Sequence, residues 1–262
     1  MPHTHSMSEQ TSAALPPTGP QWRALSGRTV RAAIREGDLG FGFLAPMIFF
    51  MCFYVPLRHS MERSGMNYAQ YLLPVIILQG MFFTAMSAAD RAALDTASGM
   101  GARLRSMPVR PWVPMAARMS ANASRAVVAI AGALVIGSVF GFRFHDAGSA
   151  VAFVVLALLF AVGVVIGADV VGTATGNPEI GAQILLLPQL LLIMASTGFV
   201  PVEGFPGWIQ PIVRWQPVSV CSDALRALAA GRYDSVSGAL AWSVALIVVF
   251  AAVSARIGRR AR

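Results

Sequence analysis

The sequence predicts an all-α integral membrane protein with six transmembrane helices, and three observations lead to this prediction. Of the 262 residues, 56% are hydrophobic and only 12% are charged, about half the charged share of a soluble domain. The mean hydropathy of +0.63 indicates more apolar surface than one soluble core can bury. The apolar residues also gather in six stretches. Each stretch is long enough to cross about 30 Å of hydrocarbon as a helix, whereas barrel strands would need only about ten residues.

The six predicted spans are residues 39–57, 71–89, 124–140, 150–171, 184–200 and 238–255. The first is interrupted by Pro46 and closed by Pro56, the third is rich in alanine, and the fifth is short and contains Pro188. Between the fifth and sixth spans, four prolines forbid one continuous helix. We therefore expect broken external helices there, ending in a short helix over residues 219–230.

The residues before the first span predict a tail and an interfacial helix. Residues 1–20 are rich in Ser, Thr, Pro and Gly and lack the apolar run of a signal peptide, which predicts a disordered cytoplasmic tail. Over residues 21–36, Trp22 and Leu25 fall on one helical face and Arg31 falls on the opposite face. This pattern predicts an amphipathic helix in the headgroup plane, with a partly ordered juxtamembrane tail as the alternative. Residues 21–262 then form one transmembrane domain.

The distribution of arginine predicts the orientation in the cytoplasmic (inner) membrane. With the N-terminus inside, six crossings return the C-terminus to the cytoplasm, and 14 of the 20 arginines lie in cytoplasmic segments. This agrees with the positive-inside rule. Because these arginines flank spans and form no single exposed patch, the net charge of +8 does not predict a nucleic-acid partner.

No residue pattern typical of catalysis or metal binding occurs. The four histidines lack metal-ligand spacing, and the two cysteines support no metal cluster. The chain also contains no lysine, which excludes a G-x-x-x-x-G-K-[S/T] phosphate-binding loop among these residues. The sequence therefore predicts a protein that is not an enzyme, and any ATP that drives it must be bound by another polypeptide.

The longest predicted cytoplasmic loop, residues 90–118, is the first candidate functional segment. Asp90 and Asp95 precede a short apolar helix, and Leu104 and Met107 follow amid arginines. Apolar side chains that fill a groove, with charges that fix the register, are typical of a docking element for a soluble partner. A helix that lies back against the bundle is the alternative.

The connection after the fifth span is the second candidate. Its aromatic residues are of the type that settles at the membrane interface. Broken backbone persists at membrane depth only where it is buried in protein or lines a cavity. We therefore predict an external gate, with an interfacial loop as the alternative. The gate residues are Phe205, Pro206, Trp208, Ile209, Pro211, Pro217 and Arg226.

Asp169 is the only acid within a predicted span. An intramembrane acid is by default a candidate for a proton relay or a substrate site. Because Asp169 falls near the cytoplasmic end of its span, we expect a polar contact at the helix end. The alternative function is a proton-coupled secondary drug efflux protein that uses Asp169.

Three segments resemble the ABC-2 class of ABC-transporter permeases, specifically the daunorubicin-resistance type. They are STGFVPVEGFPGWIQPIVRWQPVSVCSDALRALAAG at 196–231, GFRFH at 141–145, and the D-x-V-G-T-x-T-x-N-P-E pattern at 169–179. The resemblance covers nearly the whole chain after residue 21. It is strongest to mycobacterial permeases tied to export of the lipid phthiocerol dimycocerosate, and drug-exporting permeases form the other branch.

The resemblance implies a half-transporter that exports an amphiphilic lipid or hydrophobic drug. Two such permeases, either two copies or a copy and a sister chain, pair among membrane lipids with two cytoplasmic ATPase subunits that bind ATP and Mg²⁺. The family's glutamate-rich pattern before a T-P is replaced here by DRAALDTASGMGARLRSMP. The implied ATPase-coupling residues are Trp22, Arg31, Asp90, Leu94, Asp95, Leu104, Arg105, Met107 and Pro108.

Overall fold

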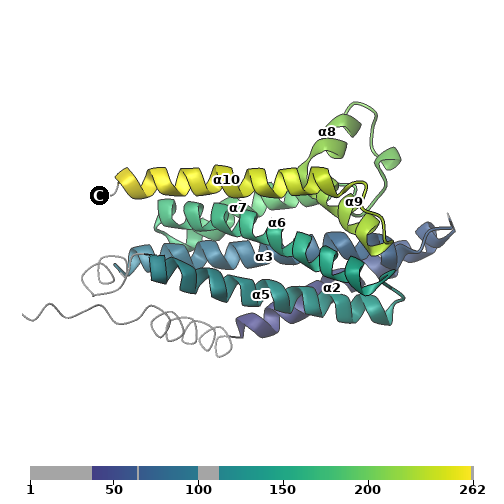
Figure 1. The fold of residues 1–262 in the computed structure, drawn as a ribbon, viewed down its shortest axis with the longest axis horizontal. Coiled ribbons are helices and arrows are strands. Elements are labelled where there is room, and N and C mark those ends of the chain that lie inside the picture. Colours follow the sequence, from purple (N-terminus) through teal and green to yellow (C-terminus); the bar gives the residue numbers. More distant parts are fainter. Residues whose placement is uncertain (1–36, 64, 100–111, 261–262) are drawn as a thin grey trace, which may run out of the picture.

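The computed structural model describes residues 37–63, 65–99 and 112–260, and within these ranges the regular secondary structure is entirely helical. The long helices lie side by side, while α8 projects away from the bundle (Figure 1). The all-α prediction is confirmed for these ranges. The elements are α2 (Asp38–Glu62), α3 (Tyr68–Ala97), α5 (Trp112–Val139), α6 (Ala147–Thr175), α7 (Pro178–Met194), the 3₁₀ helix η1 (Val202–Gly204), α8 (Gln210–Trp215), α9 (Pro217–Ala229) and α10 (Val236–Arg260).

Five of the described helices, α2, α3, α5, α6 and α10, are long and apolar enough to cross a membrane. The fifth predicted span corresponds to α7, which has 17 residues. At about 1.5 Å per residue, α7 is roughly 25 Å long, slightly less than the hydrocarbon thickness of about 30 Å. Length and composition therefore identify five candidate spans and one shorter apolar helix.

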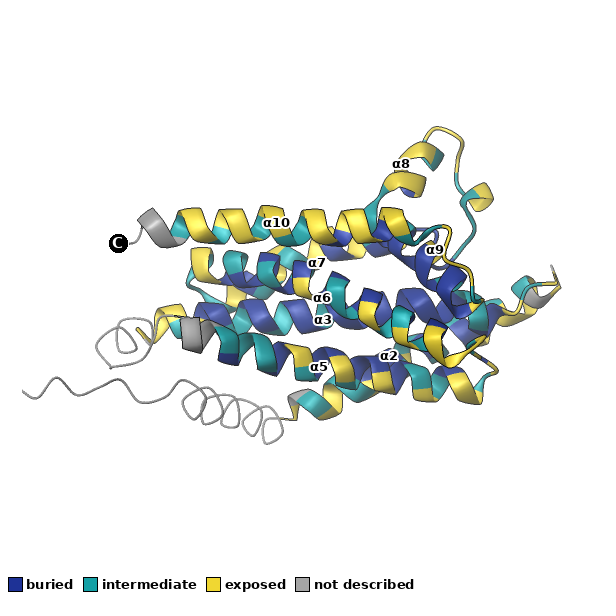
Figure 2. Cartoon of the chain, in the orientation of Figure 1, coloured by how far each residue is buried: buried dark blue, intermediate teal, exposed yellow. Residues whose placement is uncertain are grey.

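Helix α3 lies at the centre of the bundle and packs against α2, α5, α6, α7 and α9. It begins where the Asn67 side chain accepts a hydrogen bond from the backbone N–H of Gln70, which satisfies a free donor of the first turn. Residues from Leu72 to Leu78 along this helix are buried, so α3 is apolar on all sides. By contrast, α10 exposes Val244, Val248 and other apolar side chains along its outer face, as suits contact with lipid (Figure 2).

Glycines set the closest helix contacts. A Cβ at Gly172 on α6 would overlap the backbone carbonyl of Ala89 on α3. A Cβ at Gly132 on α5 would likewise overlap the carbonyl of Phe43 on α2. Small residues drive helix association in membranes by allowing this approach. These two positions therefore hold α6 against α3 and α5 against α2.

The predicted loop over residues 90–118 is too long. Helix α3 continues through Asp90, Leu94 and Asp95 to Ala97, and α5 starts at Trp112. The prediction that Asp90 and Asp95 precede a separate short helix is therefore wrong. Buried alanines continue the apolar face of α3 through this segment, and alanine is the strongest helix former.

The fifth predicted span is displaced by six residues at each end. Helix α7 begins at Pro178, because the Asn177 side chain caps its first turn and proline suits the first helical position. It ends at Met194, after which the backbone N–H of Thr197 donates to Ser219 Oγ on α9 rather than continuing the helix. The short helix predicted over residues 219–230 is confirmed as α9, with Pro217 as its first residue.

Several predictions fall on residues outside the described ranges. These are the tail over residues 1–20, the amphipathic helix over residues 21–36, and six of the nine coupling residues. The six are Trp22, Arg31, Leu104, Arg105, Met107 and Pro108.

Candidate functional site

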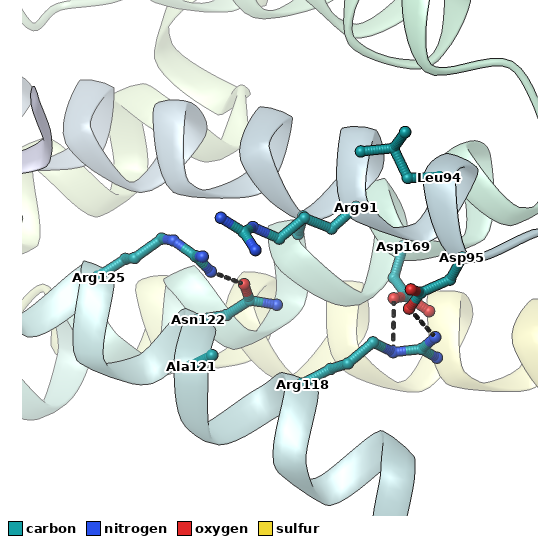
Figure 3. Close-up of a pocket in the computed structure, with 9 residues that line it drawn as sticks. Arg91, Leu94, Asp95, Arg118, Ala121, Asn122, Arg125 and Asp169 are labelled. Carbon is teal, nitrogen blue, oxygen red and sulfur yellow. Dashed lines mark hydrogen bonds and ion pairs between the residues drawn. The ribbon is translucent and has the colours of Figure 1, made fainter. Parts of the chain in front are cut away.

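A cluster of charged residues lies at the end of the bundle where α3 and α6 finish and α5 begins (Figure 3). We call it the arginine cluster. Its side chains come from three helices: α3, α5 and α6. They surround a cavity of about 160 Å³ together with Ala88, Leu94 and Ala121. The members of the cluster are Arg91, Asp95, Arg118, Asn122, Arg125 and Asp169.

Arg118 joins the three helices. From α5, its Nη1 lies 3.3 Å from Asp95 Oδ2 on α3, and its Nε lies 3.6 Å from Asp169 Oδ1 on α6. Asp169 is only 8% exposed, so an ionised carboxylate there needs such a partner. The expected polar contact of Asp169 at the end of its helix is confirmed. Asp95, one of the predicted coupling residues, makes an ion pair within this chain.

Arg125 is the most buried arginine of the cluster, at 3% exposure. Its Nη1 donates a 2.9 Å hydrogen bond to Oδ1 of Asn122, one helical turn away on α5. Arg125 also lines a second, narrow cavity of about 20 Å³. The arginine cluster therefore combines internal ion pairs with a buried arginine that lines two cavities.

A second polar site, which we call the Arg226 clasp, lies at the opposite end of the bundle. Its members are Tyr71 on α3, Thr197 and Gly198 after α7, and Asp223 and Arg226 on α9. Arg226 Nε donates to the carbonyl of Tyr71, and its Nη2 donates to the carbonyls of Thr197 and Gly198, each at 2.9 Å. Its Nη1 donates to Asp223 Oδ1 at 2.6 Å, and the guanidinium lies 3.7 Å from the centre of the Tyr71 ring. One side chain thus ties α9 to two other parts of the chain.

In the clasp, burial and the neighbouring charges shift the pKa values of Arg226 and Asp223 in opposite directions. Burial lowers the pKa of Arg226, while the neighbouring Tyr71 and Asp223 oppose that change. Burial raises the pKa of Asp223, while the charge of Arg226 and the hydroxyl of Thr197 oppose the rise. Because the arginine side chain stays protonated in proteins, the geometry makes this site an anchor rather than a proton donor.

The residues predicted as an external gate separate into two groups. Pro217 and Arg226 belong to α9, which packs on α3, α6 and α10. The others, from Phe205 to Pro211, belong to the projection that carries α8, where Trp208 is 77% exposed (Figure 2). The predicted gate residues therefore divide between the packed helix α9 and the exposed projection.

The structure brings together several residues that were not among the predicted site residues. Arg118 was treated only as part of a loop, Arg125 only as part of a span, and Asn122 was not considered. Their spacing of four and three residues nevertheless places them on one helical face. Tyr71 and Thr197 were missed at the clasp, and no sequence signal connects them to Arg226, because they lie more than 25 residues away. The part of the chain that the structure describes contains no group of three or more His, Cys, Asp or Glu arranged to hold a metal ion.

Comparison with known proteins agrees with this architecture. Residues 55–256 match the ABC-2 family transporter protein family. The chain is 35% identical over 252 residues to the doxorubicin resistance ABC transporter permease protein DrrB of Mycobacterium tuberculosis, covering 89% of this chain and 87% of that protein.

Two further relatives have related names. The probable doxorubicin resistance ABC transporter permease protein DrrC of Mycobacterium tuberculosis is 32% identical, with 72% of this chain and 69% of the relative covered. The daunorubicin resistance ABC transporter permease protein DrrB1 of Streptomyces coeruleorubidus is 30% identical, with 82% and 77% covered. The chain, a multi-pass membrane protein rather than an enzyme, therefore belongs to the ABC-2 family of ABC-transporter permeases.

Proposed function

We propose that this chain is the membrane-spanning subunit of an ABC exporter that moves an amphiphilic lipid or hydrophobic drug outward across the cytoplasmic membrane. The observation that carries the proposal is the match to ABC-2 permeases over residues 55–256. The chain has no lysine to serve a nucleotide-binding loop, so ATP and Mg²⁺ are assigned to a separate ATPase subunit. The names of the relatives support a drug such as doxorubicin as one class of cargo.

The coupling surface for the ATPase is assigned to the end of the bundle that holds the arginine cluster. Leu94 on the last turns of α3 is 53% exposed there. An exposed leucine beside charged residues has the composition of a docking surface. The residues Leu104, Arg105, Met107 and Pro108 follow in the chain, and Trp22 and Arg31 are assigned to the same interface.

This end of the bundle is assigned to the cytoplasm. Arg91, Arg118 and Arg125 gather at it, and the C-terminal end of α10 also lies there (Figure 1). A concentration of arginine is typical of the cytoplasmic side. In this orientation α7 makes the fifth of six crossings, despite its 17 residues, with the membrane thinning locally around it.

The external gate is assigned to the segment between α7 and α10. Trp208 and Trp215 in the α8 projection are 77% and 76% exposed, and tryptophan favours the membrane interface. We assign to this projection the contact with the outer leaflet, and to the Arg226 clasp the role of fixing α9 beneath it. A second permease, either another copy or a sister chain, completes the translocation path.

The proton-coupled alternative has no support from the geometry. This alternative uses Asp169 as its titrating acid, and Asp169 lies 3.6 Å from Arg118 Nε. Asp169 and Arg118 form an ion pair that joins α6 to α5. Asp169 is therefore assigned a structural role.

Export assays with and without the ATPase test the proposal. Cells would express the chain alone, the candidate ATPase alone, or both, and the retention of doxorubicin and the outward transfer of a labelled long-chain lipid would be measured. Export only with both chains, lost when the ATPase carries a disabled nucleotide site, is the expected result. Export by this chain alone, abolished by Asp169→Asn, would refute the proposal.

The docking surface has its own test. Leu104→Asp together with Met107→Asp is expected to abolish co-purification of the ATPase and export. The matched control is Trp208→Asp in the α8 projection, which is expected to leave co-purification unchanged. Normal ATPase binding by the double variant would remove the coupling assignment but not the transport assignment.

A further inference from the structure

Aromatic rings hold the C-terminal half of α2, the outer half in the proposed orientation, against its neighbours. Tyr54 packs on Phe140 of α5 and on Tyr68 of α3, with ring centroids 4.9 and 6.1 Å apart. The preceding residue, Phe53, stacks instead on Phe199, which follows α7. The centroids of these two rings are 4.0 Å apart and their planes are inclined by 27°. The first span therefore contacts both the α3–α5 pair and the segment after α7.

The Arg226 clasp anchors the segment that carries Phe199. Arg226 Nη2 donates to the carbonyls of Thr197 and Gly198, the two residues before Phe199. The backbone N–H of Thr197 also donates to Ser219 Oγ on α9. Hydrogen bonds from a charged group are stronger than a single aromatic pair. Phe199 is therefore bound more firmly to α9 than to Phe53 on α2.

The backbone of α2 is weakened beside Phe53. Pro56 lies inside the helix. Because proline has no backbone N–H, the carbonyl of Cys52, four residues earlier, loses its usual helical donor. Sharp bends in helices occur at such prolines. The outer end of α2 can therefore change direction next to the ring pair at little cost in backbone hydrogen bonds.

We propose that the Phe53–Phe199 ring pair is the closed outer gate of this permease, and that the two rings part when cargo leaves toward the outer leaflet. Separating two rings leaves no polar group unpaired, unlike breaking the clasp. In the open state α2 stays with α5 through Phe50 and Tyr54, which both pack on Phe140. Phe199 stays with α9. The inference rests on the proposed export function and adds a residue of the first span to the gate.

A reversible cross-link between α2 and the segment after α7 tests the gate. In a Cys52→Ala background, Phe53→Cys and Phe199→Cys would be joined by a short bifunctional methanethiosulfonate. Proteoliposomes would hold the complete complex with its ATPase, and export of doxorubicin and of the labelled long-chain lipid would be measured. We expect the cross-link to abolish ATP-driven export and dithiothreitol to restore it.

The matched control joins the same helix to the neighbour that it is proposed to keep. Tyr54→Cys and Phe140→Cys, cross-linked between α2 and α5, are expected to leave export unchanged. Continued export with Phe53→Cys joined to Phe199→Cys would overturn the inference without touching the proposed function. Equal loss of export in the control would also overturn it, because α2 would then have to move away from α5 as well. Absence of ATP-driven export by the unaltered complex would remove the proposed function and the gate together.

Distance measurements test the gate while both rings stay in place. Val55 on α2 and Ile212 on α8 are exposed, so spin labels on Val55→Cys and Ile212→Cys are expected to preserve the fold. Because α8 packs on α9, it reports the position of the anchored segment. Double electron–electron resonance is expected to show a longer α2–α8 distance when the complex is trapped with ATP and vanadate. The control pair, Val55→Cys with Val139→Cys on α5, is expected to keep its distance. An unchanged α2–α8 distance in an exporting complex would overturn the gate.

Discussion

Replacing Arg226 with lysine tests whether the Arg226 clasp anchors α9. The substitution keeps the positive charge but removes the planar fork, which makes four hydrogen bonds to four different residues. A lysine ammonium is a compact group at the end of a flexible stem. It can retain the bond to Asp223 but cannot reach the carbonyls on α3 and after α7 together.

The size of the effect follows from the bonds lost. At least two charge-assisted bonds disappear, each contributing about 1.5–3 kcal/mol. The side chain of Arg226 is 15% exposed, so water can replace little of what is lost. Allowing for relaxation, we expect Arg226→Lys to lower the free energy of unfolding by about 2–4 kcal/mol, and Arg226→Ala by about 3–5 kcal/mol, because alanine leaves Asp223 without its charged partner.

Thermal unfolding of the purified chain in detergent measures this effect. For a chain of this size, 1 kcal/mol corresponds to about 2–4 °C in Tm, so Arg226→Lys is expected to lower Tm by roughly 5–15 °C. Limited proteolysis is expected to cleave the segment between α7 and α9 faster in the variant. The control is Arg214→Lys on α8, where the arginine is exposed. A Tm within about 2 °C of the unaltered chain, with unchanged proteolysis, would refute the anchoring role.

Three further predictions concern other parts of the bundle. Asp169→Asn is expected to lower the free energy of unfolding by about 1–3 kcal/mol, because it removes one charge from the pair with Arg118. ATP-driven export is expected to persist in this variant. Complete loss of export in a folded variant would contradict this prediction. Gly172→Leu is expected to prevent α6 from packing on α3, because the new side chain would overlap the backbone of α3. The measurement is size-exclusion chromatography, in which the variant is expected to lose its monodisperse peak. Normal elution and an unchanged Tm would contradict the close contact. Burial raises the pKa of the Cys221 thiol to about 12. In a Cys52→Ala background, maleimide labelling of the folded chain is therefore expected to be slow at pH 8, whereas rapid labelling at pH 8 would indicate an accessible thiolate.

Local sequence patterns predicted the helices but not all their ends. The long apolar runs of α2, α5, α6 and α10 specify a membrane-spanning helix by length and composition alone. The end of α3 was misplaced because Asp90 and Asp95 look like loop residues, whereas the buried alanines between them continue the helix against α6. The end of α7 was misplaced because the apolar stretch continues in the sequence after Met194. In the structure the helix ends there, and the backbone N–H of Thr197 donates a hydrogen bond to Ser219 on α9.

By itself, the sequence determined that this chain is a helical membrane protein and an ABC-2 permease without a nucleotide-binding lysine. These properties depend on composition, on segment length and on short motifs such as the one at residues 196–231, all of which are local. Only the tertiary structure decided that Asp169 pairs with Arg118 and that Arg226 bonds to Tyr71 and Thr197. The partners in these contacts lie 29 to 155 residues apart and meet only after the helices pack, so no local pattern can specify them.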